Sequence, residues 1–265
     1  MPDYPNSLKP KKSTSISDNL VYPNFCIKAS TDLRIFSNFR RNKIYQHILE
    51  HVSFELGSAY LEEIKKTNPE VLKSIESFKQ NDEWGNPEVF DYSQLGKISP
   101  STIRYIKVFG DLISIFKNMD DFNICEIGVG YGGQCRIINS VTAPSGYTLV
   151  DIKPALMLSQ VYLDNYILSS VLKYKTMNEL EVQNYDLVIS NYAFTELPRG
   201  IQDVYLKKIV LNSKRGYITY NDISPDYFKS YKREELLKII PNSRIIDEKP
   251  LTHARNCIIV WGDKN

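Results

Sequence analysis

The apolar residues follow two patterns along the chain, and the change comes near residue 120. From Thr31 to Lys66, apolar positions recur at helix-like intervals, with a break expected near Gly57. A short helix is predicted after Pro69, which stands at a favourable first position, and another after Ser99, a typical helix start. The first part of the chain is therefore predicted to be mostly helical.

After residue 120, short and nearly continuous apolar runs alternate with helical patterns. The runs are NICEIGV, GYTLVDI, VLKYK, YDLVISNY, GYITYND, RIID and NCIIVWG. Such runs are typical of parallel strands in a sheet that helices cover on both faces. The loop between the last two runs is too short for a crossover helix, so these two should form an antiparallel hairpin. The predicted fold class is α/β, with a mostly parallel seven-stranded sheet.

Three regions follow from these patterns. Residues 1–30 mix Pro, Lys, Ser and Asn without periodicity and are predicted to be a flexible arm. Residues 31–98 form a helical segment that ends in a long loop rich in Asp, Asn, Gly and Pro. Loops of this length inside a domain tend to be functional. Residues 99–265 form the sheet domain.

Composition excludes several classes of protein. With 33 basic and 31 acidic residues, the net charge of +2 gives no global field for holding a nucleic acid polymer. No apolar run approaches the roughly 18 residues that span a bilayer, and no signal peptide is recognisable, so a cytoplasmic protein without membrane insertion is expected. The four cysteines are scattered without a CxxC pair, which indicates neither a zinc site nor a disulfide framework.

The stretch ICEIGVGYGGQCRII, residues 124–138, contains the strongest functional signal. Gly128, Gly130 and Gly132 lie between a predicted strand and a predicted helix, where bare backbone lets a ligand approach the helix N-terminus. Asp151 ends the next strand, 23 positions after Gly128, where an acidic residue can accept both hydroxyls of a ribose. Together these features predict a cofactor that contains adenosine.

Two cofactors use this arrangement. A dinucleotide places its pyrophosphate on the helix dipole, and an NAD-type oxidoreductase is therefore one interpretation. S-adenosylmethionine sites typically have an acidic residue before the glycines, as Glu126 is here, and a polar-aromatic segment after the fourth strand, as in SNYAFTEL. The terminal antiparallel hairpin also favours the second cofactor, because a standard dehydrogenase half lacks it.

The glycine block and five further segments resemble a known family. SPSTIRYIKVFGDL, ICEIGVGYGGQCRII, YTLVDIKPALMLSQVYL, YDLVISNYAFTELP, RGYITYND and CIIVWG are similar to the bacterial family of sugar O-methyltransferases, a branch of the Rossmann-like class I enzymes that use S-adenosylmethionine. The resemblance runs from about Asp82 to Trp261 and is weak in the helical N-terminus. It implies an acceptor that is a sugar or sugar-linked intermediate of a surface polysaccharide.

The resemblance also implies roles for individual residues. The glycines would surround the methionine and ribose, Glu126 would orient them, and Asp151 would bind the ribose. Gln134, at the helix start, could donate to the methionine carboxylate or to the acceptor. Arg104 on the preceding helix could reach cofactor or acceptor. The full set of predicted cofactor contacts is Tyr105, Glu126, Gly128, Gly130, Gly132, Gln134, Asp151, Ile152, Asn178, Asn191 and Tyr192.

An alkyl hydroxyl is a poor nucleophile at neutral pH, so a general base or a metal is expected near it. The candidate bases are His253, between the last two strands, and Glu196 and Asp222, both at strand ends. His47 and His51 stand four residues apart, but no third ligand accompanies them, so they are interpreted as surface residues and no metal site is predicted.

The predicted function is methyl transfer from S-adenosylmethionine to a hydroxyl of a sugar or nucleotide-linked sugar. Trp84, Tyr92 and the segment Asp82–Pro87 could form a lid over that sugar, or the aromatic side chains could only hold the loop in place. A non-sugar acceptor remains open, for example a phosphoryl or phosphoramidyl oxygen that is already anionic and needs no strong base. A binding protein that keeps the fold without catalysis is a further alternative. The helical segment would cover the active site or build a homo-oligomer.

Overall fold

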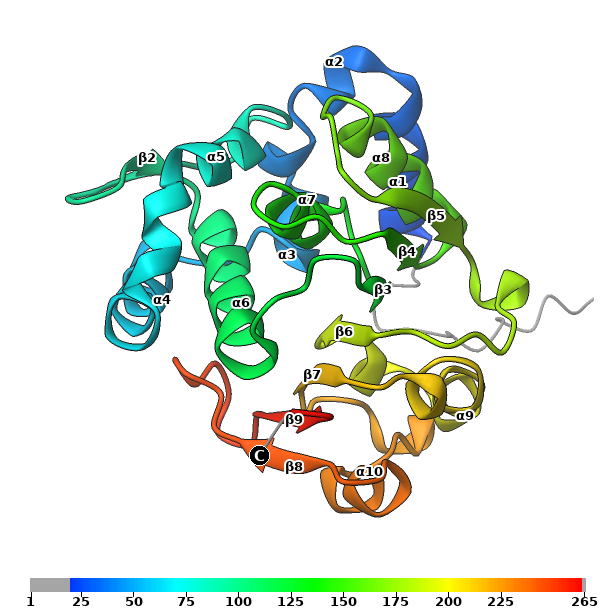
Figure 1. The fold of residues 1–265 in the computed structure, drawn as a ribbon. Helices are drawn as coiled ribbons and strands as arrows, with labels where there is room; N and C mark the ends of the chain where they lie inside the picture. The colour runs from blue at the N-terminus through cyan, green and yellow to red at the C-terminus, as the bar shows by residue number, and fades with distance from the viewer. Residues whose placement is uncertain (1–19, 264–265) are drawn as a thin grey trace, which may run out of the picture.

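The structure is a computed structural model, and it describes residues 20–263. At its centre is a seven-stranded sheet with the order β5-β4-β3-β6-β7-β9-β8 (Figure 1). The predicted strands are all present. They are β3 (Asn123–Ile127), β4 (Gly146–Val150), β5 (Val171–Lys175), β6 (Leu187–Asn191), β7 (Gly216–Tyr220), β8 (Arg244–Ile246) and β9 (Cys257–Trp261).

The directions of the strands confirm the predicted fold class. Strands β3, β4, β5, β6 and β7 are mutually parallel, whereas β9 runs antiparallel to both β7 and β8. The hairpin expected at the end of the chain is therefore β8–β9, and β9 is inserted between β7 and β8. A parallel sheet with this order and one reversed strand is the Rossmann-like class I methyltransferase fold.

Alternate residues of each strand enter two separate cores. In β3, Ile124 belongs to a core that contains α6, α7, α8 and the N-terminal helices, while Cys125 belongs to a second core built with α9 and α10. Side chains of successive strand residues point to opposite faces, so a strand covered on both sides must be apolar throughout. This explains the continuous apolar runs in the sequence. The helices are α6 (Pro100–Phe116), α7 (Gly133–Asn139), α8 (Lys153–Leu163), α9 (Arg199–Lys208) and α10 (Arg233–Ile239).

The N-terminal segment is helical, as predicted, but its elements differ in position. No helix in residues 20–263 is both long and apolar enough to cross a membrane. The break expected near Gly57 falls at residues 49–53, and Gly57 lies inside the helix that follows. The elements are α1 (Val21–Thr31), α2 (Leu33–Phe36), α3 (Lys43–Ile48), α4 (Phe54–Thr67) and α5 (Ile75–Lys79).

Helix α1 corrects the prediction of a flexible arm. The arm was assigned to residues 1–30, of which residues 1–19 lie outside the described part of the chain. Residues 21–30 are helical and pack along α8 (Figure 1). Tyr22, Phe25, Cys26 and Ala29 are buried, and the rings of Tyr22 and Phe25 pack on Tyr45 of α3. Their spacing is that of one apolar helix face, so burial of these side chains stabilises a helix that the prolines and asparagines in the sequence had obscured.

The long loop after α5 also differs from the prediction. It contains a short hairpin of β1 (Phe90–Tyr92) and β2 (Gly96–Ile98) that projects from the molecule (Figure 1). Trp84 packs against Phe36, with ring centroids 5.7 Å apart, and the buried Tyr92 stacks on Phe54 at 5.0 Å. These aromatic side chains therefore hold the loop against the N-terminal helices, which is the second of the two predictions for them, and a lid over the sugar stays a prediction.

A buried charge cluster, which we call the Arg40 hub, joins the N-terminal segment to the sheet domain. Arg40 is fully buried and pairs with Glu50 at 2.7 Å and with Asp82 at 2.9 Å. Asp82 in turn accepts hydrogen bonds from Ser99, the N-cap of α6. The guanidinium also lies 4.8 Å from the ring centre of Tyr131, which belongs to residues 128–132, the loop that contains the glycines (the glycine loop). The hub thus connects the N-terminal helices, α6 and the glycine loop.

Candidate active site

The glycine loop, residues 128–132, joins β3 to α7. Gly128, Gly130 and Gly132 all have a positive φ, of 79°, 55° and 88°, which L side chains rarely adopt. A Cβ at Gly128 would overlap that of Ala193, and one at Gly130 would lie 2.6 Å from Leu49 Cδ1. The glycines therefore permit both the turn and the close approach of the segments that follow α3 and β6.

Asp151 holds the glycine loop against the end of β4. One carboxylate oxygen accepts a hydrogen bond from the backbone N–H of Gly130 at 3.1 Å, and the other accepts from that of Ile152 at 2.7 Å. Burial raises the pKa of Asp151 to about 6, although the backbone hydrogen bonds oppose this shift. Asp151 thus lies where the sequence predicted, at the end of β4 and beside the glycine loop, and it is ionised at neutral pH.

Glu126, on β3, is buried below the glycine loop. Its carboxylate accepts a hydrogen bond of 2.6 Å from the hydroxyl of Tyr147 on β4. Burial raises the pKa of Glu126 to about 8, and the hydrogen bond from Tyr147 only partly compensates. Its side chain is engaged by the sheet next to it, so any role in orienting a cofactor stays a prediction.

Two polar groups beside the glycine loop lack a partner in the described part of the chain: the amide oxygen of Gln134 has no hydrogen-bond donor, and the guanidinium of Arg104 has no carboxylate. Gln134 is buried at the start of α7, and its amide nitrogen donates to the carbonyl of Tyr105, but among the described residues its oxygen Oε1 accepts nothing. The guanidinium of Arg104 donates to the carbonyl of Leu49 and lies over the ring of Tyr105. No carboxylate within residues 20–263 pairs with Arg104, which is half-buried.

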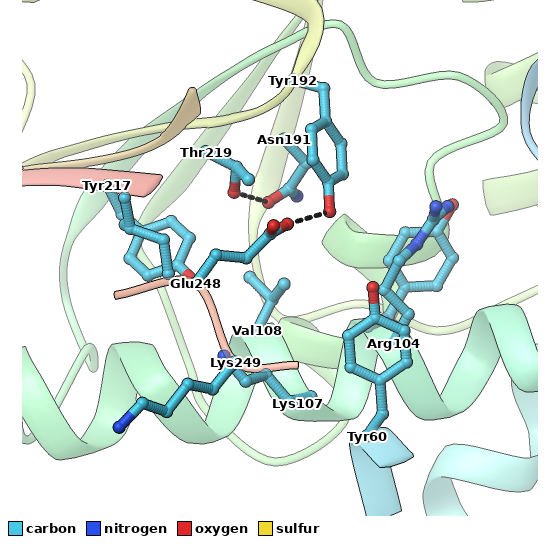
Figure 2. Close-up of a pocket in the computed structure, with 12 residues that line it drawn as sticks. Tyr60, Arg104, Lys107, Val108, Asn191, Tyr192, Tyr217, Thr219, Glu248 and Lys249 are labelled. Atoms are coloured by element: carbon cyan, nitrogen blue, oxygen red, sulfur yellow. Dashed lines mark hydrogen bonds between the residues drawn. The ribbon is translucent and has the colours of Figure 1, made fainter. Parts of the chain in front are cut away.

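A narrow cleft extends from Arg104 to the carboxyl ends of β6 and β7 (Figure 2). Open α/β sheets bind their ligands at this edge. Asn191 and Thr219 form one wall, where the Thr219 hydroxyl donates to Asn191 Oδ1 at 3.5 Å. The predicted cofactor contacts Tyr105, Asn191 and Tyr192 all line this cleft, and two residues that the sequence did not indicate, Tyr60 and Glu248, line it as well.

Tyr192 and Glu248 form the closest polar contact in the cleft. The phenol donates a hydrogen bond of 2.6 Å to Glu248 Oε1. The carboxylate, which is 5% exposed, also accepts from the backbone N–H and the hydroxyl of Thr252. Burial, the neighbouring Tyr60 and the charge of Glu248 raise the pKa of Tyr192 well above its ordinary value. Tyr192 is therefore a neutral donor to a buried carboxylate.

The three bases proposed from the sequence do not line the cleft. His253 is exposed on the loop between β8 and β9. Glu196 accepts a hydrogen bond from Asn221 at 2.7 Å, and burial raises its pKa. Burial alone would raise the pKa of Asp222, but its hydrogen bond and ion pair with Lys232 and the charge of Arg255 leave it below its ordinary value. Their catalytic roles stay predictions without support from position.

Other predicted residues lie further from the cleft. Asn178 is exposed after β5, so its contact with adenine stays a prediction. His47 and His51 are exposed, as interpreted, but α3 ends at Ile48 and the two do not share a helix face. The four cysteines are buried and free of disulfides.

Glu248 had only a weak signal in the sequence. It lies in the EKPLTHAR loop, where attention falls on the single histidine, and a glutamate in a polar loop usually faces solvent. Its burial depends on Tyr192, which is 56 positions earlier in the chain. Only the topology, which places β9 beside β7, brings the two residues together.

No family model matches the chain, and the search of curated proteins found no match either. Among solved structures, magnesium protoporphyrin IX methyltransferase from Synechocystis PCC 6803 is 16% identical, with 59% of this chain and 76% of that chain covered and a TM-score of 0.45. The methyltransferase domain of a bacterial Hen1 is 12% identical, with 60% and 96% covered and a TM-score of 0.45. At TM-scores this low, the argument for function rests on the site itself.

Proposed function

We propose that this protein is an S-adenosylmethionine-dependent methyltransferase. The observation that carries the proposal is the pair of unmatched groups beside the glycine loop, a guanidinium without a carboxylate and a buried amide oxygen without a donor. An unpaired cation and an unsatisfied acceptor are both costly in a protein interior. The carboxylate and ammonium of an amino acid supply what each one lacks. A dinucleotide has no such head group.

The other residues of the site fit the remainder of this cofactor. Asp151 is ionised at neutral pH and lies against the glycine loop, where it can accept the ribose hydroxyls. Arg104 would hold the methionine carboxylate and Gln134 Oε1 the ammonium. This assignment differs from the sequence expectation for Gln134, because the amide nitrogen already donates to Tyr105 and the oxygen is the atom without a partner. When bound, the sulfonium supplies an activated methyl group, and positioning by the protein contributes much of the acceleration.

The cleft supports an oxygen acceptor. Asn191 and Thr219 offer polar edges to a hydroxyl, and the segment SNYAF lacks the Pro-Pro-aromatic triplet that is common in enzymes that methylate amino groups of bases. We therefore favour a hydroxyl of a sugar or nucleotide-linked sugar, as the family resemblance implies for surface polysaccharides. An anionic phosphoryl or phosphoramidyl oxygen is the second candidate, because it needs no strong base and none of the three bases predicted from the sequence lines the cleft.

Isothermal titration with S-adenosylhomocysteine tests the cofactor. The wild type should bind it in the micromolar range, and Asp151→Asn should weaken binding about tenfold or more, since charge-assisted hydrogen bonds to the ribose are lost. Asp186→Asn is a matched control, because Asp186 also accepts a backbone N–H, from Asn123, but at the opposite edge of the sheet. Wild type that binds NADH and not S-adenosylhomocysteine would overturn the proposal.

A second measurement addresses the acceptor. Release of S-adenosylhomocysteine is followed in the presence of free hexoses, nucleotide-linked hexoses and phosphorylated hexoses. Turnover that requires the nucleotide-linked compounds and leaves a methyl ether on the sugar supports the first candidate. Turnover that leaves a methyl ester on phosphate would replace it with the second.

A further inference from the structure

We propose that Tyr192 and Glu248 form a proton relay that serves as the general base of the reaction. The inference rests on the proposed function and assigns the role that the sequence left to His253, Glu196 or Asp222. The relay consists of the Tyr192 phenol, which faces the cleft, and the Glu248 carboxylate, to which the phenol donates.

The geometry of the pair suits this role. The hydrogen bond is 2.6 Å long, and Figure 2 shows the two oxygens facing each other while the ammonium of Lys249 points away from them. The phenol uses its proton for Glu248, so its oxygen can still accept a hydrogen bond from a hydroxyl in the cleft. Thr252 holds both carboxylate oxygens, because its backbone N–H donates to Oε2 and its hydroxyl lies 2.8 Å from Oε1. The carboxylate is thus preorganised to receive a proton through Tyr192.

The pair also lies next to the glycine loop. Strand β6 is the neighbour of β3 in the sheet, and the two strands end at the same edge. Ala193, directly after Tyr192, is packed so tightly on Gly128 that a Cβ there would overlap it. Tyr192 is therefore adjacent in sequence to the residue that contacts the glycine loop, and this loop would surround the methionine. Among the described residues that line the cleft, Glu248 is the one carboxylate, and it accepts the hydrogen bond from this tyrosine.

The backbone of Tyr192 is strained in a way that is typical of functional sites. Its φ is 69° and its ψ is −42°, which is a genuine outlier for a bulky aromatic residue. The conformation is held by a hydrogen bond from its N–H to the carbonyl of Thr219 and by one from Thr195 to its own carbonyl. Strain of this kind costs free energy and persists where it places a side chain for function. Here it directs the phenol toward Glu248.

The proposed step moves two protons in the same direction along the relay, one from the acceptor to Tyr192 and one from Tyr192 to Glu248. The acceptor oxygen forms a bond to the methyl carbon as the methyl–sulfur bond breaks, and that bonding electron pair remains on sulfur. The acceptor hydroxyl gives its proton to the Tyr192 oxygen while the Tyr192 proton moves to Glu248. Tyr192 ends neutral, and Glu248 ends protonated and later releases the proton to solvent. The high pKa of Tyr192 means that it carries the proton that this relay needs.

The test uses two ligands that need no acceptor. Sinefungin carries a protonated amine at the position of the transferred methyl group, whereas S-adenosylhomocysteine has no group there. If the relay faces that position, the amine lies beside the Tyr192 oxygen and the charge of Glu248. Isothermal titration should then show that Glu248→Gln and Tyr192→Phe each weaken sinefungin about tenfold while S-adenosylhomocysteine changes by less than about twofold. Glu235→Gln and Tyr185→Phe are matched controls outside the cleft and should leave the ratio unchanged.

Each outcome separates the relay from the proposed function. Wild type that binds neither ligand would overturn the cofactor assignment and the relay with it. Wild type that binds both, with an unchanged affinity ratio in Glu248→Gln and Tyr192→Phe, would overturn the relay alone. A purely structural role for the pair would weaken both ligands equally and lower the melting temperature. A selective loss of sinefungin affinity in folded variants supports the relay.

Discussion

The Arg40 hub and the candidate active site are both rich in buried charge, but the arginines in the two regions have different partners. Arg40 faces two carboxylates, and its remaining N–H groups donate to the Asn81 carbonyl and the Ser99 hydroxyl. Arg104 has a carbonyl and an aromatic ring as neighbours, and no carboxylate in residues 20–263 pairs with it. In the hub, each charged group contacts a group of opposite charge inside the protein.

This difference separates a structural site from one that awaits a ligand. A buried ion pair stabilises little overall, but the loss of one partner leaves a desolvated charge that destabilises the fold strongly. An unmatched polar group costs stability already, which is why we propose that a bound ligand supplies the partner of Arg104 and of Gln134. The surroundings of the two arginines therefore suit different roles, a structural one for Arg40 and the proposed ligand-binding one for Arg104.

The largest effect is expected at the hub. Arg40→Met leaves Glu50 and Asp82 buried without a cation and should lower the free energy of unfolding by about 3–5 kcal/mol in urea denaturation. Arg41→Ala is the control, because Arg41 forms an exposed ion pair with Glu88 at 3.5 Å and its loss should change stability by less than about 0.5 kcal/mol. Equal changes in the free energy of unfolding for the two substitutions would show that the hub contributes no more to stability than an exposed ion pair.

A somewhat smaller effect is expected at Glu126, a buried carboxylate without a cation. Folding raises its pKa to about 8, so the folded chain holds this proton more tightly than the unfolded chain. The contribution to stability is present at pH 4–5 and is lost as the pH rises through 8. As the pH rises from 5 to 9, the free energy of unfolding of Glu126→Gln should therefore increase by about 3 kcal/mol relative to that of wild type, measured by urea denaturation.

The control for Glu126 is an exposed glutamate with the opposite shift. The hydrogen bonds from Thr176 lower the pKa of Glu179, so Glu179→Gln should run parallel to wild type above pH 6. If Glu126→Gln also runs parallel to wild type, the carboxylate is already ionised at neutral pH and the charge is compensated by a group not recognised above.

The smallest effect in free energy is the most informative for function. Arg104→Met should weaken S-adenosylhomocysteine about tenfold, which is about 1.4 kcal/mol, and should change the free energy of unfolding by less than about 1 kcal/mol. Arg40→Met should show the opposite, a large decrease in the free energy of unfolding and a small effect on binding. Titration and urea denaturation of both variants test this directly. Strong destabilisation by Arg104→Met without a change in binding would place Arg104 with Arg40 as a structural residue.

The sheet was predictable because each strand carries its own signal. Burial on two faces demands continuous apolar runs, and the short loop of the hairpin determines its direction. Helix α1 also had a readable signal, since Tyr22, Phe25, Cys26 and Ala29 follow the spacing of one helix face, but Pro23 and Asn24 suggested irregular structure.

The site was only half predictable. Glu126, the glycines and Asp151 belong to one local motif and were found together. Tyr192 was predicted as a cofactor contact at the end of β6, which stays a prediction, while its positive φ could not be foreseen from the sequence. Glu248 and Tyr60 come from distant elements, and only the folded chain brings them to the cleft. When the residues of a site come from several elements, their positions in the sequence follow no recognisable spacing.

The position of Tyr131 has a consequence for how this protein could have evolved. Its ring is fully buried among Phe39, Tyr45, Tyr105 and Tyr162, and Asn81 donates to its hydroxyl. Three of these partners precede the sheet domain in the chain. The domain and the N-terminal segment are therefore not interchangeable modules. Recombination between homologues that exchanges one must carry the other along, and diversification of the acceptor should proceed by substitution within the cleft.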